Sequence, residues 1–458
     1  MVMFYRRTRT WVSESMIVND PVSLKIYEHL RWPAKTADRN TPFAQPKLIR
    51  ASHSTSLRIC IAALLVGGLS AQINAADGPA FTGLAASADD AVSAVTNPAG
   101  LTRLHQSEWV AGIQTFYASS DFTTTAQSTG GSSSDSGSTA VAIPALYYAR
   151  PITQDLTFGA SLTVPSGLGS NPGDKTATRY LLEQWSLGYA SLTPAAGYRV
   201  NEHLSLGIGV NLNYTLYDYQ TAVFNGPGQP DGKMELRDSV FGVGFQLGML
   251  YELSPSSRVG LTYTSSTSSR FSSTPELSGL TAQREALLPA GIRSQTITLE
   301  SKFPQHAGIG VWHEFADGKS ATLDLLWVDF SQFGLSSATV GSDAIEVTNE
   351  RYKDIWAASS GLKWPIDDTW AVRFGAAYAS SGVDTENRSF ALRLDRVIAA
   401  GAGTEYRWGK KRLVGVNLTY YDLGSAPVNT TVPLLGPLSG KYSSNYAIGL
   451  DMTLRWFD

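Results

Sequence analysis

The sequence predicts a closed, membrane-spanning antiparallel β-barrel of about fourteen strands with an N-terminal hatch in its lumen. Three observations predict this fold: runs of alternating apolar and polar side chains, breaks between these runs that alternate in length, and a composition poor in charge. Charged residues make up 16% of the 458 residues, well below the roughly 25% of soluble domains. One cysteine and a net charge of −3 exclude a disulfide framework and a strongly basic nucleic-acid binder.

The N-terminal part contains a stretch typical of an export signal. Residues 59–69 (ICIAALLVGGL) are apolar, but about 11 residues are too few to cross a hydrocarbon core of roughly 30 Å as a helix. Arg58 precedes this stretch and the small residue Ala75 follows it, as a signal peptidase requires. We therefore expect residues 57–75 to be a signal peptide. Because such signals normally stand at the N-terminus, we expect residues 1–56 to be a mis-annotated extension.

The next segment, residues 76–106, is predicted to be the hatch. It is rich in alanine, lacks the two-residue alternation of a strand, and contains the turn-forming pair Asn97-Pro98. About 30 such residues bury too little surface to fold alone. The simplest interpretation is a plug inserted into the lumen of the barrel that follows.

Residues 107–458 are predicted to form the barrel. In residues 446–456, for example, six apolar side chains alternate with polar or small ones, which gives a strand one apolar and one wet face. Such runs lie near residues 107–119, 140–151, 155–164, 189–200, 203–218, 239–252, 257–265, 303–315, 320–333, 353–365, 369–380, 396–408, 412–423 and 443–457.

The breaks and the strand lengths separate a membrane barrel from a soluble sandwich, which also has alternating strands. Tight turns alternate with long loops, as in outer-membrane barrels. The runs have the 9 to 11 residues that a tilted strand needs to cross a membrane, and aromatic residues gather near their ends. The polar faces also carry charges, which we expect to pair across the wall or to hold the hatch: Asp324, Lys363, Arg373, Glu405, Arg407, Asp451 and Arg455.

Two of the long loops contain enough apolar residues to form a ligand-binding groove. Arginine pairs well with carboxylates, so cations in or beside the second loop are candidates for binding an acidic cargo. The alternatives are that the apolar residues pack the loops together and that the cations are solvated. The candidates are Leu181, Leu182, Trp185, Leu277, Leu280, Leu287 and Leu288, with Arg284, Arg293 and Lys302 as the cations.

Several short segments resemble a known family. Residues 81–83 (FTG), 88–91 (ADDA) and 97–101 (NPAGL) are similar to the N-terminal signature of the long-chain fatty acid transporters of the outer membrane, the FadL/TodX type. Residues 323–333 and the tripeptide Asn387-Arg388-Ser389 resemble other parts of that family. The resemblance covers residues 76–458.

The resemblance implies a fourteen-stranded barrel in the outer membrane of a Gram-negative cell, surrounded by lipid and lipopolysaccharide and monomeric. It implies passive transport of hydrophobic compounds, either long-chain fatty acids or aromatic hydrocarbons, with capture by extracellular loops. It also implies lateral release at a kinked third strand, where Gly159 is the candidate position. The hatch motif carried over by the resemblance consists of Asp89, Asp90, Asn97, Pro98, Ala99 and Gly100.

Other functions have less support in the sequence. No cofactor is implied, and the histidines show no metal-binding spacing and no catalytic motif, so an enzyme is not predicted. A general porin and a structural envelope protein stay open as alternatives. The histidines of the expected mature chain are His105, His203, His306 and His313.

Overall fold

The computed structural model describes residues 79–458, except residues 81, 89, 289–291, 341–342, 346–351, 389, 391–394 and 433–434. The predicted extension and signal peptide, residues 1–75, lie outside the described residues, as does Asp89 of the hatch motif. Within the described part of the chain, no helix has the length and apolar character needed to span a membrane.

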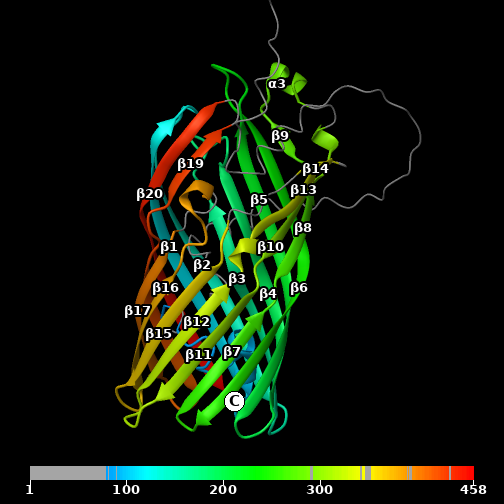
Figure 1. Ribbon diagram of the computed structural model, residues 1–458. Coiled ribbons are helices and arrows are strands. Elements are labelled where there is room, and N and C mark those ends of the chain that lie inside the picture. Colours follow the sequence, from blue (N-terminus) through cyan, green and yellow to red (C-terminus); the bar gives the residue numbers. More distant parts are fainter. Residues whose placement is uncertain are drawn as a thin grey trace, which may run out of the picture.

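The described residues form one closed barrel of fourteen strands (Figure 1). Each strand pairs with its neighbours in antiparallel register, and β1 pairs with β20 to close the cylinder. All fourteen predicted strands are confirmed. In order around the wall, the strands are β1 (Glu108–Gln127), β2 (Ser134–Pro151), β3 (Leu156–Ser170), β4 (Gln184–Arg199), β5 (Leu204–Val223), β6 (Gly232–Ser254), β7 (Ser257–Thr264), β11 (His306–Glu314), β12 (Ser320–Val328), β15 (Ile355–Pro365), β16 (Trp370–Ala379), β17 (Val397–Arg407), β18 (Arg412–Asp422) and β20 (Gly436–Phe457).

The long loops contain further strands that the sequence analysis did not predict. They are short, and their alternation is too brief to separate from a loop. A small sheet has the strand order β14-β13-β10-β8, while β9 pairs with β6 and β19 with β20. These strands are β8 (Thr267–Ser273), β9 (Glu276–Ser278), β10 (Ile297–Phe303), β13 (Gly334–Val340), β14 (Asp343–Ile345) and β19 (Pro427–Val432).

The helices of the described chain are short and lie inside the barrel or in its loops. Two belong to the hatch, α2 (Ser93–Thr96) and the 3-10 helix η2 (Pro98–Arg103). The others are α3 (Ala282–Ala286), near the tip of the long loops (Figure 1), and the 3-10 helices η3 (Ile292–Ser294), η4 (Phe330–Gln332) and η5 (Thr385–Asn387).

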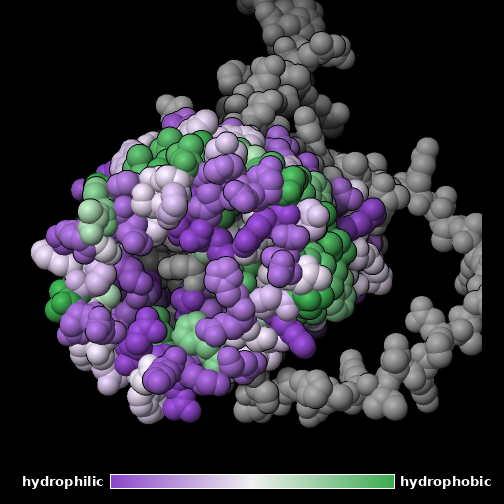
Figure 2. Space-filling model, turned by 90° about the horizontal axis from the view of Figure 1, so that it is seen from below, coloured by the Kyte–Doolittle hydropathy of each residue, from purple (hydrophilic) through white to green (hydrophobic). Residues whose placement is uncertain are grey.

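The two faces of the wall carry opposite chemistry, as the alternation predicts. On β5 the outward side chains are exposed and apolar, with Ile208 54% exposed, while the inward Asn211 and Asn213 are buried. Seen from the end that carries the short turns, hydrophilic residues cover most of the surface and hydrophobic residues gather in places along its edge (Figure 2). An apolar outer surface matches the hydrocarbon of a membrane.

We predict that a charge on the outward face destabilises the barrel according to its depth. Ile208 lies four residues from its short turn, near the middle of a membrane crossing. Ile208→Arg should lower the free energy of unfolding by about 2–4 kcal/mol, whereas the same change at Leu253, beside a short turn, should cost about 0–1 kcal/mol. Urea unfolding in lipid vesicles measures both values. Equal costs at the two positions would contradict the membrane orientation.

Candidate functional site

The hatch occupies the lumen at the end of the barrel that carries the short turns. Pro98 begins η2, where its missing N–H group is tolerated, and the Asn97 side chain accepts a hydrogen bond from the backbone N–H of Ala99 at 3.1 Å. The Asn97 amide also donates to the carbonyl oxygens of Ala85, at 2.6 Å, and of Met249 on β6, at 3.1 Å. This buried side chain therefore joins two parts of the hatch to each other and to the wall.

Polar side chains of the wall hold the hatch by its backbone. The Asp324 carboxylate on β12 accepts hydrogen bonds from the N–H groups of Gly83, at 2.9 Å, and Ala85, at 3.1 Å. From β7, Arg258 donates to the carbonyl oxygen of Ala86 at 2.6 Å, and its guanidinium lies 3.6 Å from the ring centre of Trp312. Holding the hatch is one of the two roles predicted for the lumen charges.

The hatch-motif residue Asp90 lies beside an ion pair of the wall. Arg455 on β20 pairs with Glu108 at 3.0 Å and lies 3.9 Å from the Asp90 carboxylate. Glu108 also accepts a hydrogen bond from the N–H of Ala91 at 2.9 Å. The motif residues Pro98, Ala99 and Gly100 are all buried in η2, so the motif forms the interior of the closure.

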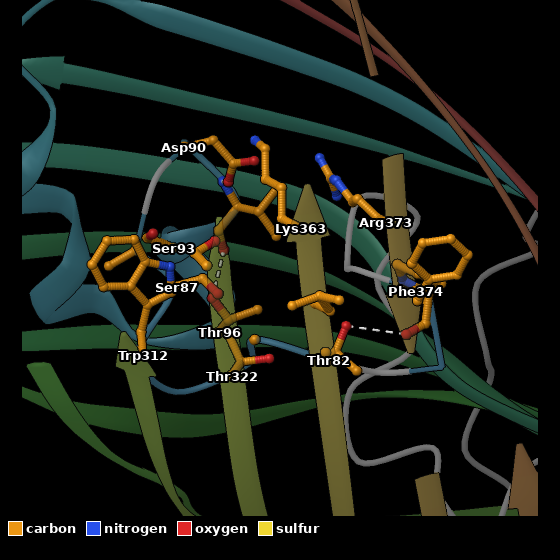
Figure 3. A pocket seen from close by; sticks show the side chains of 17 residues that line it. Thr82, Ser87, Asp90, Ser93, Thr96, Trp312, Thr322, Lys363, Arg373 and Phe374 are labelled. Atoms are coloured by element: carbon orange, nitrogen blue, oxygen red, sulfur yellow. Dashed lines mark hydrogen bonds between the residues drawn. The ribbon is translucent and has the colours of Figure 1, made fainter. Parts of the chain in front are cut away.

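A polar pocket lies between part of one side of the hatch and strands β11, β12, β15 and β16 (Figure 3). Hydroxyl groups of the hatch, such as Thr82 and Ser93, and of the wall, such as Thr322, line it together with the cations Lys363 and Arg373. Both cations form salt bridges with the buried Glu405 on β17.

The opposite side of the hatch is apolar. Here Val95 and Leu101 form a buried cluster with residues of β1, β2 and β4, among them Tyr147 and Ala195, and Leu101 lies against Gly159 of β3. Strand β15, beside the polar pocket, is seven strands from β3 in either direction around the barrel. The hatch therefore presents an apolar side to β3 and a polar side to the wall across from it.

Above the hatch, the half of the barrel nearer the long loops contains a large apolar cluster, which includes Phe116 and Phe271. The structure brings most of the predicted groove residues into it. Leu181 and Leu182 are each 2% exposed, and four others pack against the cluster while partly buried: Trp185, Leu277, Leu280 and Leu288. Leu287 is 73% exposed and does not join them.

The three predicted cations lie outside this cluster. Arg293 pairs with Glu285 at 3.0 Å, and Arg284 lies on α3, which buries none of its residues. Along β10 the buried side chains alternate with partly exposed ones, which puts Lys302 on the face opposite Phe303. The sequence placed these three cations in or beside a loop, but it could not show which way their side chains point.

The sequence analysis missed a group of residues that joins three long loops. Arg179 pairs with Asp231 at 2.8 Å and donates to the carbonyl of Thr129 at 3.2 Å. The Tyr180 hydroxyl donates to Asp231 at 2.7 Å. Burial, together with this hydrogen bond, raises the pKa of Tyr180 to about 12. These residues lie far apart in the sequence, in breaks with no periodic pattern.

A second missed residue is Arg388, one of the largest fully buried side chains. It pairs with Asp395 at 3.2 Å and donates to the carbonyl of Pro427 at 3.2 Å. Burial lowers the pKa of this guanidinium, while the Asp395 charge opposes the shift. Its place in the tripeptide Asn387-Arg388-Ser389 was the one signal for it in the sequence.

The wall is paired incompletely between β2 and β3. Their register runs from Pro151–Thr157 to Leu146–Leu162 and extends no farther, although β2 continues along β1 and β3 along β4. The β3–β4 register shifts between Thr163 and Ser166, a step that contains Pro165, which has no N–H to donate.

Gly159 is not at this break. It pairs with Ala149 on β2 and with Ala195 on β4, and a side chain there would meet Leu101 of the hatch. Its sequence signal, glycine within a strand, reflects close packing against the hatch. The pairing of β3 with β2 ends at Leu162, three residues beyond Gly159, so the position of the opening stays a proposal.

A closed barrel with an apolar outer surface and its own N-terminal segment in the lumen defines a plugged outer-membrane channel. A model of the family described as outer membrane protein transport protein (OMPP1/FadL/TodX) matches residues 62–456. The chain belongs to this family of outer-membrane transport proteins, which are not enzymes.

Relatives agree with this assignment, and solved structures have the same fold. The long-chain fatty acid transport protein of Escherichia coli K12 is 25% identical over 387 residues, which cover 77% of this chain and 86% of that protein. Outer membrane protein P1 of Haemophilus influenzae is 23% identical, with 77% and 88% covered. A Pseudomonas aeruginosa FadL homologue has a TM-score of 0.74 at 18% identity, with 84% and 98% covered. The Ralstonia pickettii toluene transporter TbuX has a TM-score of 0.62 at 16% identity, with 85% and 99% covered.

We predict that the Tyr180 hydroxyl ionises at a higher pH than an ordinary tyrosine. Its raised pKa of about 12 lies above the ordinary value near 10, so ionisation is disfavoured in the folded loops. The stabilisation from this difference is fully present below about pH 10 and is lost as the pH rises toward 12. Phenolate absorbance of the wild-type protein minus that of Tyr180→Phe should show a midpoint near 12. Asp231→Asn should move this midpoint down, and a midpoint near 10 in the wild type would contradict the contact.

Proposed function

We propose that this protein carries hydrophobic molecules inward across the outer membrane by binding them in the apolar cluster above the hatch. The observation that carries the proposal is this cluster itself, buried among long loops directly above a plugged lumen. The named functions of the relatives support it, since they include transport of long-chain fatty acids and of toluene.

The hatch, held in the lumen by polar side chains of the wall, argues against a general porin. A porin needs an aqueous lumen, whereas this lumen holds a hatch that the wall grips from several strands through Asp324, Arg258 and Glu108. A hydrophobic cargo does not need such a lumen, because it can leave the barrel sideways into the membrane.

The place we propose for lateral release is the stretch where β2 and β3 are not paired, above Leu146 and Leu162. Two observations support it. The backbone ladder that elsewhere closes the wall stops there, and the apolar side of the hatch, with Leu101, faces the same strands. A hydrophobic molecule moving past the hatch on this side would meet apolar groups along its path.

A neutral cargo is a second candidate, favoured over a carboxylate by the charges around the cluster. The cations beside it are paired with carboxylates: Arg179 with Asp231, Arg388 with Asp395. An incoming carboxylate would have to compete with these partners, whereas an aromatic hydrocarbon needs only the apolar surface. Parallel uptake assays with radiolabelled oleate and toluene distinguish the two cargoes.

We predict that Leu181→Asn weakens uptake and that Leu287→Asn does not. Leu181→Asn puts an amide into the apolar cluster, and desolvating an amide without a hydrogen-bond partner costs about 1–3 kcal/mol, so the half-saturating ligand concentration should rise roughly 10- to 100-fold. Leu287 is the matched control because it lies outside the cluster. The measurement is uptake by cells that lack other transporters of this family. Equal uptake by both variants would count against the cluster as the binding site.

We also predict that tying β2 to β3 stops release. Ala145 and Thr163 are the next residues beyond the last pair of the β2–β3 register. With the single natural cysteine replaced by Cys60→Ser, oxidation of Ala145→Cys with Thr163→Cys should abolish uptake, and reduction should restore it. The control is Arg150→Cys with Phe158→Cys, a pair inside the existing register. Undiminished uptake after complete cross-linking would exclude this route.

A further inference from the structure

Glycines on neighbouring strands pair with one another on the inner face of the wall, at the level of the hatch. Gly197 on β4 pairs with Gly207 on β5, which pairs with Gly248 on β6. Farther around the wall, Gly361 on β15 pairs with Gly375 on β16. We use the name glycine girdle for six residues: Gly197, Gly207, Gly248, Gly260, Gly361 and Gly375.

At each girdle position, a side chain would collide with the hatch. An added Cβ would lie closer than 3.0 Å to a hatch atom at all six positions. At Gly207 this atom is the backbone nitrogen of Ala99, and at Gly260 it is the carbonyl oxygen of Ala85. Backbone atoms cannot rotate away as a flexible side chain can, so the hatch lies directly against the bare backbone of the wall.

Strand curvature does not account for these glycines. Glycine inside a strand marks either a bend or the close approach of another backbone. The β4, β5 and β6 registers run without a shift through Gly197, Gly207 and Gly248, so these glycines do not lie at bulges. Gly415 on β18 shows the contrast, since a Cβ there would meet the Thr453 hydroxyl and no hatch atom.

The girdle also touches both halves of the hatch. Gly197, Gly207 and Gly248 face the second half, from Asn97 to Thr102, whereas Gly260, Gly361 and Gly375 face Pro79, Thr82 and Ala85 of the first half. Asn97 hydrogen-bonds these two halves to each other through Ala85. A shift of the hatch away from either set of glycines would therefore be transmitted to the other.

We propose that the glycine girdle is the seat that seals the closed channel: it lets the hatch backbone lie flush on the wall, so that polar solutes cannot pass around it. The girdle residues act as positioning residues for the hatch. The inference rests on the proposed function only in that the hatch is taken as the closure. It adds a requirement that the proposed function does not contain, namely glycine at the six wall positions on β4 to β7, β15 and β16 that touch the hatch.

The test uses full-length protein in planar bilayers, without any hydrophobic ligand. Gly207→Ala and Gly260→Ala should lift the hatch and raise the steady potassium chloride conductance about ten-fold or more, because the wall cannot absorb the added carbon. Cells expressing these variants should also become sensitive to vancomycin, a large hydrophilic antibiotic. Gly415→Ala is the matched control, an inner-face glycine that meets only the Thr453 hydroxyl, and should conduct like the wild type.

A compensating double variant distinguishes a displaced hatch from a barrel that folds badly. At Gly361 the added Cβ would meet the side chain of Thr82 on the hatch and the Thr322 hydroxyl on the wall, which can rotate away. Gly361→Ala should therefore leak, and combining it with Thr82→Gly, which removes the contact with the hatch, should reseal the channel. Heat-modifiable migration in gels confirms a folded barrel for each variant. Folded girdle variants that conduct no more than Gly415→Ala, or a Gly361→Ala leak that Thr82→Gly fails to reduce, would overturn the proposal. Because conductance needs no ligand, a negative uptake assay leaves this result unaffected.

Discussion

The hydrogen-bonding demand of the wall backbone is the constraint on which the rest of this structure depends. Inside a bilayer no water is available to unpaired N–H and C=O groups, so each strand has to pair on both sides and the sheet has to close. The β1–β20 register meets this demand for the terminal strands. An interruption is tolerated where protein covers it, and the unpaired stretch of β2 carries buried apolar side chains such as Val141 and Ile143.

Closure also determines what the lumen can hold. Inward positions on fourteen strands face one another across the cylinder, and this lumen divides into two chemical zones. Near the short turns, polar and charged groups such as Asp324 and Arg258 bind the hatch backbone. Nearer the long loops, aromatic and aliphatic groups such as Phe271 fill the interior. The hatch separates a compartment suited to hydrophobic molecules from the periplasmic end.

The hatch differs from a globular plug because it has little core of its own. Its backbone donors and acceptors are satisfied by side chains of strands that lie far apart in the sequence, and its apolar side is buried by β1 to β4. Its closed position is therefore a property of the wall as much as of the hatch. The loops are tied in a comparable way by the Arg179–Asp231 pair, which connects segments about 50 residues apart.

The sequence by itself determined the strands, their inner and outer faces, and the presence of the hatch, because alternation and turn chemistry are local properties. It also indicated the apolar loop residues, most of which meet in one cluster. Only the tertiary structure decided which side chains meet. Lys302 faces away from the cluster because of its parity on a strand that the sequence did not reveal. Gly159 packs against Leu101 of the hatch, and the unpaired stretch lies beyond it. Contacts between distant strands depend on register and closure, which no local pattern contains.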